Sequence, residues 1–147
     1  MGTLNVPAAG VVYVDTAPII YSVEKHPDYW ALLQPLWVAS QAGQIVPATS
    51  ELTLLETLVL PLKQGNSALV MDYEDILTNP QMWLLPITSN ILYQAAHLRA
   101  RHNFKTPDAL HAATALASGC VQLITNDAIF RRVPGLNVVV LHELVTP

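Results

Sequence analysis

The sequence predicts an α/β fold in which a mostly parallel sheet is covered by helices on both faces. Short apolar runs rich in β-branched residues alternate along the chain with longer segments of helical pattern. Strands separated by helices rather than by tight turns pair in parallel. The 147 residues contain no linker, low-complexity tract or internal repeat, so we expect one domain over residues 1–147, with residues 1–10 as an irregular lead-in.

Five runs have the length and composition of strands buried on both faces of a sheet. They are residues 11–14, 45–47, 83–87, 121–124 and 137–141. The third run is the weakest of the five, because Pro86 interrupts it and proline cannot donate to a sheet ladder.

Seven segments are predicted to be helical. They are residues 16–24, 27–43, 50–61, 66–77, 88–103, 106–119 and 128–132. Pro35 is expected to kink or break the second, and Thr49 or Ser50 is the expected cap of the third. Thr106-Pro107 combines an N-cap residue with a proline suited to the first helical position, and Gly119 is expected to end that helix.

The composition points to an intracellular protein with a partner. A single cysteine, Cys120, leaves no internal disulfide and fits a reducing compartment, and the chain shows neither a signal peptide nor a stretch of membrane-spanning length. We therefore expect a cytoplasmic protein without membrane contact. Hydrophobic residues make up 52% and charged residues 12% of the chain, which indicates that a partner or second copy covers part of the surface.

Four carboxylates stand where the predicted fold has little structural use for them. Asp15 directly follows the first strand, and Asp127 follows the fourth strand and the pair Thr125-Asn126. Open α/β sheets bind ligands along this edge, at the carboxyl ends of the strands. A structural role is also open to three of the acids: Asp15 and Asp127 could cap helices, and Asp108 would be stabilised in the first turn of its helix.

The fourth carboxylate, Glu56, lies in the middle of an almost wholly apolar helix, where capping cannot explain it. A buried carboxylate is costly unless it is paired or binds a metal, so Glu56 is expected to have a cation nearby. Glu51 belongs to the start of the same helix, where the helix dipole is a sufficient reason for an acid. We therefore leave Glu51 out of the candidate site.

Gathered at one edge of a sheet, the four acids would repel one another without bound cations. Ligation by oxygen alone favours a hard ion, Mg²⁺ or Mn²⁺, and the chain lacks the Cys and His spacing of a zinc site. Mg²⁺ held by few carboxylates keeps waters that a phosphate oxygen can displace. Metal-assisted cleavage of a phosphodiester is the chemistry that this set predicts.

Four motifs of the chain resemble those of PIN-domain ribonucleases, in particular the toxins of VapBC toxin–antitoxin modules. The motifs are residues 12–16, Ser50 with Thr53 and Glu56, residues 105–111, and residues 125–130. They occur in the family order, and the likeness extends from about Val11 to Leu141. The lead-in of residues 1–10 is longer than the family needs, and Pro18 and Pro35 make the first helices irregular.

The resemblance implies a three-layer α/β/α fold with a five-stranded parallel sheet. It also implies a Mg²⁺- or Mn²⁺-dependent endoribonuclease that forms a homodimer and is blocked by a cognate, VapB-like antitoxin. By the same resemblance, the catalytic and metal-binding residues are Asp15, Glu56, Asp108 and Asp127. Thr125 would hold a carboxylate in place, and Asn126 would be a supporting or turn residue.

Four further residues are candidates for RNA contact. His111 lies one turn after Asp108 on the same helical face, although a histidine on an apolar helix is more often a hydrogen-bonded core residue. Lys105, Arg131 and Arg132 suit an RNA backbone, and solvated surface charge explains them equally well.

Two other functions remain open to a chain of this kind. A noncatalytic PIN-fold scaffold would bind RNA or protein without cutting, but all four acids are present. A receiver-like signalling domain also has an acidic metal pocket. That pocket needs paired acids after the first strand and a lysine near the last, whereas Asp15 stands alone and no lysine follows Lys105.

Overall fold

The computed structural model describes residues 2–145 and contains a five-stranded, entirely parallel sheet with strand order β3-β2-β1-β4-β5. The strands are β1 (Val11–Val14), β2 (Val46–Ser50), β3 (Trp83–Leu85), β4 (Gln122–Thr125) and β5 (Val138–Val140). All five predicted strands are therefore present. β2 extends three residues beyond its predicted end, because Thr49 and Ser50 pair with Leu84 and Leu85 of β3.

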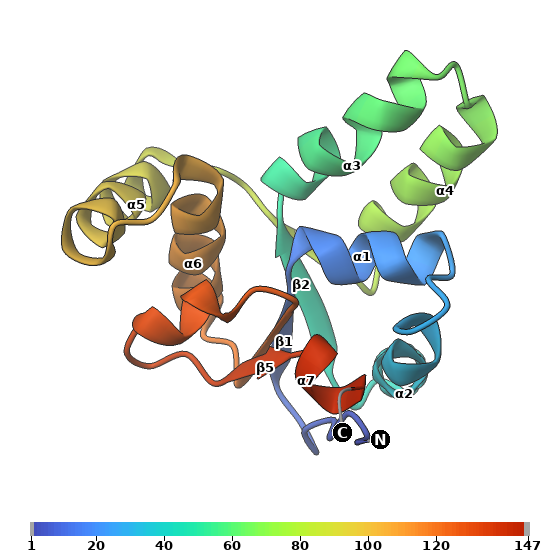
Figure 1. Cartoon of the computed structure of the whole chain (residues 1–147), viewed down its shortest axis with the longest axis horizontal. Helices are drawn as coiled ribbons and strands as arrows, with labels where there is room; N and C mark the ends of the chain where they lie inside the picture. The colour runs from blue at the N-terminus through green and yellow to red at the C-terminus, as the bar shows by residue number, and fades with distance from the viewer. Residues whose placement is uncertain (1, 146–147) are drawn as a thin grey trace.

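Helices cover both faces of the sheet, which confirms the predicted three-layer α/β/α architecture (Figure 1). The helices are α1 (Thr16–Val23), α2 (Trp30–Gln41), α3 (Leu52–Lys63), α4 (Ser67–Leu77), α5 (Ser89–His102), α6 (Thr106–Ser118), the 3-10 turn η1 (Ala128–Arg132) and α7 (His142–Val145). The terminal helix α7 was not predicted from the sequence.

Two hydrophobic cores lie on opposite faces of the sheet, and β1 contributes to both through the alternation of its side chains. Tyr13 packs into the core beneath α5 and α6, whereas Val12 and Val14 pack into the core beneath α1, α2 and α4. All three side chains are fully buried. This alternation puts the Tyr13 hydroxyl on the same side of the sheet as α6.

Helix α6 packs against the sheet through a buried face on which four of the eight buried residues are alanine. Its start differs from the prediction by one position: Lys105 is the N-cap residue, and Thr106 and Pro107 already lie in the first turn. Proline is tolerated there because the first N–H groups of a helix have no partner within it. Gly119 ends α6 in a left-handed conformation, with φ of +65°, as expected.

The predicted break at Pro35 is wrong, because α2 runs through it without interruption. Pro35 and Ala31 lie on the exposed side of the helix, so the carbonyl of Ala31, which loses its helical donor at Pro35, is on the solvent side. The opposite side carries Leu33 and Leu36, both fully buried, and this packing holds the helix together. α2 also begins at Trp30, three residues later than predicted.

Helix α3 departs from the prediction at both ends. Its N-cap is Glu51, which makes no capping hydrogen bond with its side chain, although the hydroxyl of Ser50 accepts a hydrogen bond from the Leu52 N–H. The helix then continues through Pro61 to Lys63. Residues 2–10 contain no helix or strand, and within residues 2–145 no helix is long and apolar enough to cross a membrane.

The strand order reverses direction at β1. The chain moves from β1 outward to β2 and β3, then returns to the other side of β1 with β4 and β5. In such sheets the loops after the two strands at the reversal part from each other and open a crevice at the carboxyl edge. Here that crevice lies between the ends of β1 and β4, where Asp15 and Asp127 follow.

Candidate active site

Strands β1 and β4 place Asp15 and Thr125 side by side. Val14 pairs with Ile124 in the sheet register, and the Asp15 N–H continues the ladder by donating to the Ile124 carbonyl over 3.0 Å. The buried Thr125 hydroxyl donates to Asp15 Oδ2 over 2.8 Å. Asp15 Oδ1 accepts from the Thr16 N–H over 2.8 Å, so the same carboxylate caps α1. Asp15 can therefore cap α1 and also belong to the candidate site.

Glu56 reaches the same edge from the second turn of α3. Its Oε1 accepts hydrogen bonds from the Thr16 hydroxyl and from His111 Nε2, each over 2.7 Å. Burial by itself would raise the pKa of Glu56, but the hydrogen bonds from His111 and Thr16 outweigh it, and the pKa is lowered. The imidazole of His111 is thus a hydrogen-bond partner of this carboxylate, and it is a cation only when protonated. The cation expected near Glu56 from the sequence stays a prediction.

His111 is almost completely buried and bonded at both ring nitrogens. Nδ1 lies 2.7 Å from the Tyr13 hydroxyl, and Nε2 lies 3.6 Å from Asp15 Oδ1 as well as bonding to Glu56. Burial would lower the pKa of His111, but the hydrogen bond to Glu56 and the charges of Asp15, Glu56 and Asp108 raise it. The imidazole therefore has a tendency to carry positive charge between the carboxylates.

Asp108 and Asp127 complete the acidic set. Asp108 lies in the first turn of α6, and Asp127 caps η1 by accepting from the Ile129 N–H over 3.0 Å. The pKa of Asp108 is raised by its partial burial and then by the negative charges of Asp127 and Asp15. A raised pKa of this origin is expected for carboxyl groups that lie close enough to repel one another.

One open pocket of about 440 Å³ collects these groups. Its lining residues are Asp15, Thr16, Ala17, Ile20, Tyr21, Glu56, Asp108, His111, Asn126 and Asp127. The structure thus brings all four predicted acids together, and His111 and Asn126 with them. Thr125 lies behind Asp15 rather than in the lining, and its hydroxyl accepts from the Asp127 N–H over 3.0 Å, which links the two acids.

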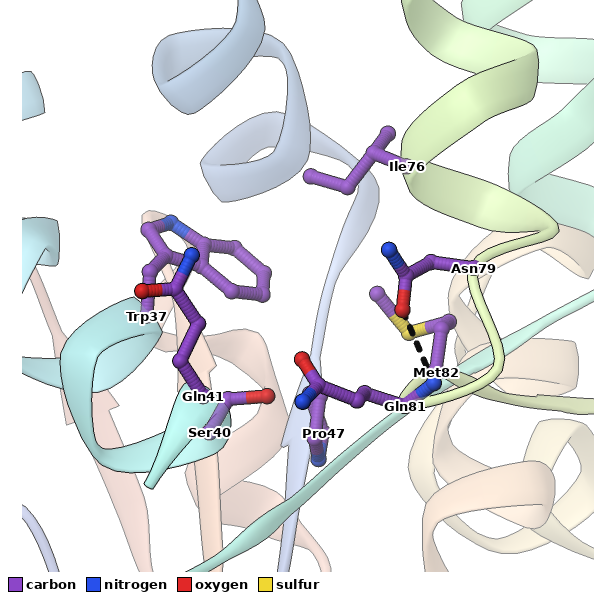
Figure 2. Close-up of a pocket in the computed structure, with 8 residues that line it drawn as sticks. All are labelled: Trp37, Ser40, Gln41, Pro47, Ile76, Asn79, Gln81 and Met82. Atoms are coloured by element: carbon purple, nitrogen blue, oxygen red, sulfur yellow. Dashed lines mark hydrogen bonds between the residues drawn. The ribbon is translucent and has the colours of Figure 1, made fainter. Parts of the chain in front are cut away.

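Figure 2 shows a second, smaller hollow of about 180 Å³ between α2, β2 and the connection from α4 to β3. Its lining residues are Trp37, Ser40, Gln41, Pro47, Ile76, Asn79, Gln81 and Met82. None of these eight side chains is acidic or basic, so this hollow offers no charged ligand to a metal ion and no group for acid–base chemistry.

The three predicted basic contacts do not line the acidic pocket. Arg131 makes a bidentate ion pair with Glu143 on α7, with both nitrogen–oxygen distances at 2.6 Å. Arg132 donates to the backbone carbonyl of His102, and Lys105 is the residue that precedes α6. Their contact with RNA stays a prediction. Asn126 bonds to the Tyr21 hydroxyl and accepts from the His142 N–H, which ties the pocket wall to α7.

Sequence reasoning did not select Tyr13, Thr16 and Tyr21 for the site. Thr16 follows Asp15 directly, and Tyr13 precedes Asp15 by two positions on the strand, so proximity in sequence was an available signal for both. Tyr21 lies five positions after Thr16 on α1 and lines the pocket. Its hydroxyl accepts a hydrogen bond from the Asn126 side chain.

The donor set suits a hard cation, although the side chains are not closed around one. Within residues 2–145, no three Asp, Glu, His or Cys side chains are gathered tightly enough, as they stand, to hold a metal ion between them. Mg²⁺ sites in enzymes commonly use one or two carboxylates, with waters and substrate oxygens filling the other positions. The oxygen-rich pocket and the raised pKa of Asp108 both fit a site of this open kind.

The PIN domain family matches residues 12–136, which include all four acids. The chain belongs to the PIN-domain family. Its sheet order, its helical layers and the acidic pocket at the carboxyl edge of β1 and β4 are thus features of this PIN domain.

Solved structures of low sequence identity share the fold of this PIN domain. A structure of VapBC2 from Rickettsia felis, bound to a DNA fragment from its promoter, has 20% identity and a TM-score of 0.71, over 88% of this chain and 97% of that chain. VapC20 from Mycobacterium tuberculosis, a toxin that cleaves the sarcin-ricin loop, has 19% identity and a TM-score of 0.68, over 82% and 93% of the two chains.

A toxin–antitoxin complex from Klebsiella pneumoniae has 22% identity and a TM-score of 0.64, over 87% of this chain and 95% of that chain. A comparison with curated proteins gave no match. The structural neighbours therefore support the fold assignment, and the PIN family match supplies the family.

Proposed function

We propose that this PIN domain is a metal-dependent endoribonuclease and the toxin component of a VapBC-type toxin–antitoxin module in the cytoplasm. The observation that carries the proposal is the convergence of Asp15, Glu56, Asp108 and Asp127 on one open pocket at the reversal point of the sheet. Repulsion among these acids favours binding of a divalent cation, and an open pocket leaves room for a phosphate.

Asp15, Glu56, Asp108 and Asp127 would hold Mg²⁺ or Mn²⁺ through their oxygens. When bound, the ion supplies positive charge that stabilises the phosphate and makes a water easier to deprotonate. The chain itself keeps the carboxylates in place: Thr125 bonds to Asp15, and Thr16 and His111 bond to Glu56. Groups prearranged in this way do not have to reorganise during the reaction.

The proposed partners are RNA, an antitoxin and a second copy of the chain. Structures of VapBC and toxin–antitoxin complexes share this fold, which supports an antitoxin as a partner. A basic side chain of that antitoxin would complement the charge of the acidic pocket. Large apolar side chains are exposed on two helices, Leu55 and Leu62 on α3 and Leu92 and Tyr93 on α5. Exposed apolar groups of this size favour a homodimer through helix faces, with the pocket left open in each copy.

Paired variants of one helix test the proposed activity. Glu56→Gln removes the charge of a pocket carboxylate, whereas Glu51→Gln changes an exposed residue outside the pocket, whose Oε1 accepts from the Ile87 N–H. Glu56→Gln should abolish Mn²⁺-dependent RNA cleavage in a folded protein, and Glu51→Gln should cleave like the unsubstituted protein. Equal loss in both variants would contradict the role of Glu56, and absence of cleavage in the unsubstituted protein would favour the noncatalytic scaffold.

A further inference from the structure

The Tyr13 side chain is completely buried, and its hydroxyl lies in a hydrophobic core. A buried hydroxyl is destabilising unless it finds a hydrogen-bond partner. Its partner on α6 is His111 Nδ1 at 2.7 Å, from 98 positions later in the chain, and the Thr49 side chain and the Ser50 backbone also form hydrogen bonds with the hydroxyl. Phenylalanine would fill the same space without needing a partner. Of these three contacts, the one with His111 joins the Tyr13 hydroxyl to a side chain that lines the acidic pocket.

The contact orients the imidazole for Glu56. An ionised carboxylate only accepts hydrogen bonds, so the 2.7 Å bond between His111 Nε2 and Glu56 Oε1 requires a hydrogen on Nε2. Tyr13 engages the opposite nitrogen of the ring, and the two bonds together fix both the ring plane and the position of the Nε2 hydrogen. The ring is also held by burial, since only 3% of its side-chain surface is exposed.

Glu56 needs this support more than the other acids do. It is carried by a long side chain on α3, and 29% of its side-chain surface is exposed, against 13% for Asp15. Thr16 and His111 both bond to Oε1, which leaves Oε2 as the oxygen available to a cation in the pocket. Without the bond from His111, Oε1 would keep the Thr16 hydroxyl as its remaining donor, and the side-chain torsions of Glu56 would be less restricted.

We propose that Tyr13, acting through His111, is a positioning residue for Glu56 and thereby sets the affinity of the acidic pocket for a divalent cation. The inference rests on the proposed metal-dependent function of the pocket. Hydrogen bonds behind metal-binding side chains commonly change metal affinity by about 10-fold to 100-fold when they are removed. Tyr13 would then contribute to the site although its hydroxyl reaches neither solvent nor the pocket.

Tyr13→Phe is the test, with Tyr73→Phe as the matched control. Tyr73 is equally buried and bonds through its hydroxyl to the carboxylate of Glu24, outside the acidic pocket. Isothermal titration with Mn²⁺ should give a dissociation constant raised about 10-fold or more in Tyr13→Phe, and unchanged in Tyr73→Phe. Both variants should stay folded by circular dichroism, because each retains its aromatic ring.

Two further measurements separate positioning from a general loss of stability. In a Glu56→Gln background, Tyr13→Phe should produce no additional change in Mn²⁺ affinity, because the residue through which it acts is already altered. NMR of the His111 ring tests, in the absence of metal, whether the bond from Tyr13 to Nδ1 holds the ring in place. The Nε2 hydrogen of His111, identified by its loss in His111→Gln, should be protected from exchange in Tyr73→Phe and exposed to it in Tyr13→Phe.

A Mn²⁺ affinity in Tyr13→Phe within about twofold of the unsubstituted protein would overturn the inference. So would a His111 ring hydrogen that remains protected in that variant. Failure of the proposed function has a different signature. If the unsubstituted protein binds no Mn²⁺, the metal-dependent activity is refuted, and the proposed effect of Tyr13 on cation affinity is refuted with it. If the protein binds Mn²⁺ but does not cleave RNA, only the activity is refuted.

Discussion

Replacing Thr125 by valine removes one hydroxyl from the centre of the site while keeping the side-chain shape. Thr125 is completely buried at the end of β4. Its hydroxyl donates to Asp15 Oδ2 over 2.8 Å and accepts from the Asp127 N–H over 3.0 Å. The substitution therefore breaks two hydrogen bonds and leaves Asp15 with one fewer donor.

The expected loss of stability follows from the charge and burial of these groups. A hydrogen bond to a charged group contributes about 1.5–3 kcal/mol. The Asp15 side chain is only 13% exposed, so water replaces the lost donor poorly. For a protein of this size the loss corresponds to a decrease in melting temperature of about 3–12 °C. A weaker hold on Asp15 should also raise the Mn²⁺ dissociation constant about 10-fold or more.

Thermal unfolding and isothermal titration with Mn²⁺ would measure both effects, with Thr125→Ser as the control. Serine keeps the hydroxyl and loses a methyl group, so it should retain the Mn²⁺ affinity even where the missing methyl lowers stability. The reasoning is refuted if Thr125→Val binds Mn²⁺ as tightly as Thr125→Ser and unfolds at the same temperature. That outcome would mean that Asp15 is held by its other contacts alone.

Three other predictions follow from the same pocket and the apolar surface. Mg²⁺ or Mn²⁺ should raise the melting temperature by mass action and should not do so in Asp15→Asn; an unchanged melting temperature across both titrations would count against the site. Asp108→Asn should stabilise the metal-free protein at neutral pH, because burial, Asp127 and Asp15 raise the pKa of Asp108 and make its charged form unfavourable in the folded state. That gain should shrink as the pH falls through the raised pKa of Asp108 toward the ordinary aspartate value of 3.8, and it should be absent below 3.8, where both states are protonated. A melting temperature lower than that of the unsubstituted protein at pH 7 would contradict the prediction. Light scattering at micromolar concentration should give about twice the 16.0 kDa chain mass, and a strictly monomeric mass would refute the dimer.

Local signals in the sequence were sufficient for the order of the elements and for the edge of the sheet that carries the site. Short β-branched runs, helix caps and Gly119 depend on residues a few positions apart, so they can be read along the chain. Asp15 and Asp127 follow strands directly, and parallel strands place their carboxyl ends at one edge. The same local rules failed at Pro35, where packing of the buried face of α2 outweighed the missing hydrogen bond.

Only the tertiary structure decided how the acids are held. Glu56 meets His111 across 55 positions, and His111 meets Tyr13 across 98. The sequence marked Glu56 as unusual, but it gave no sign of which residues hold it. The sequence suggested Arg131 as a candidate RNA contact. The structure pairs its side chain with Glu143 on α7, a helix that was not predicted. Contacts of this kind depend on how separate elements pack against one another, and periodicity along one element carries no information about the side chain that a neighbouring element places beside it.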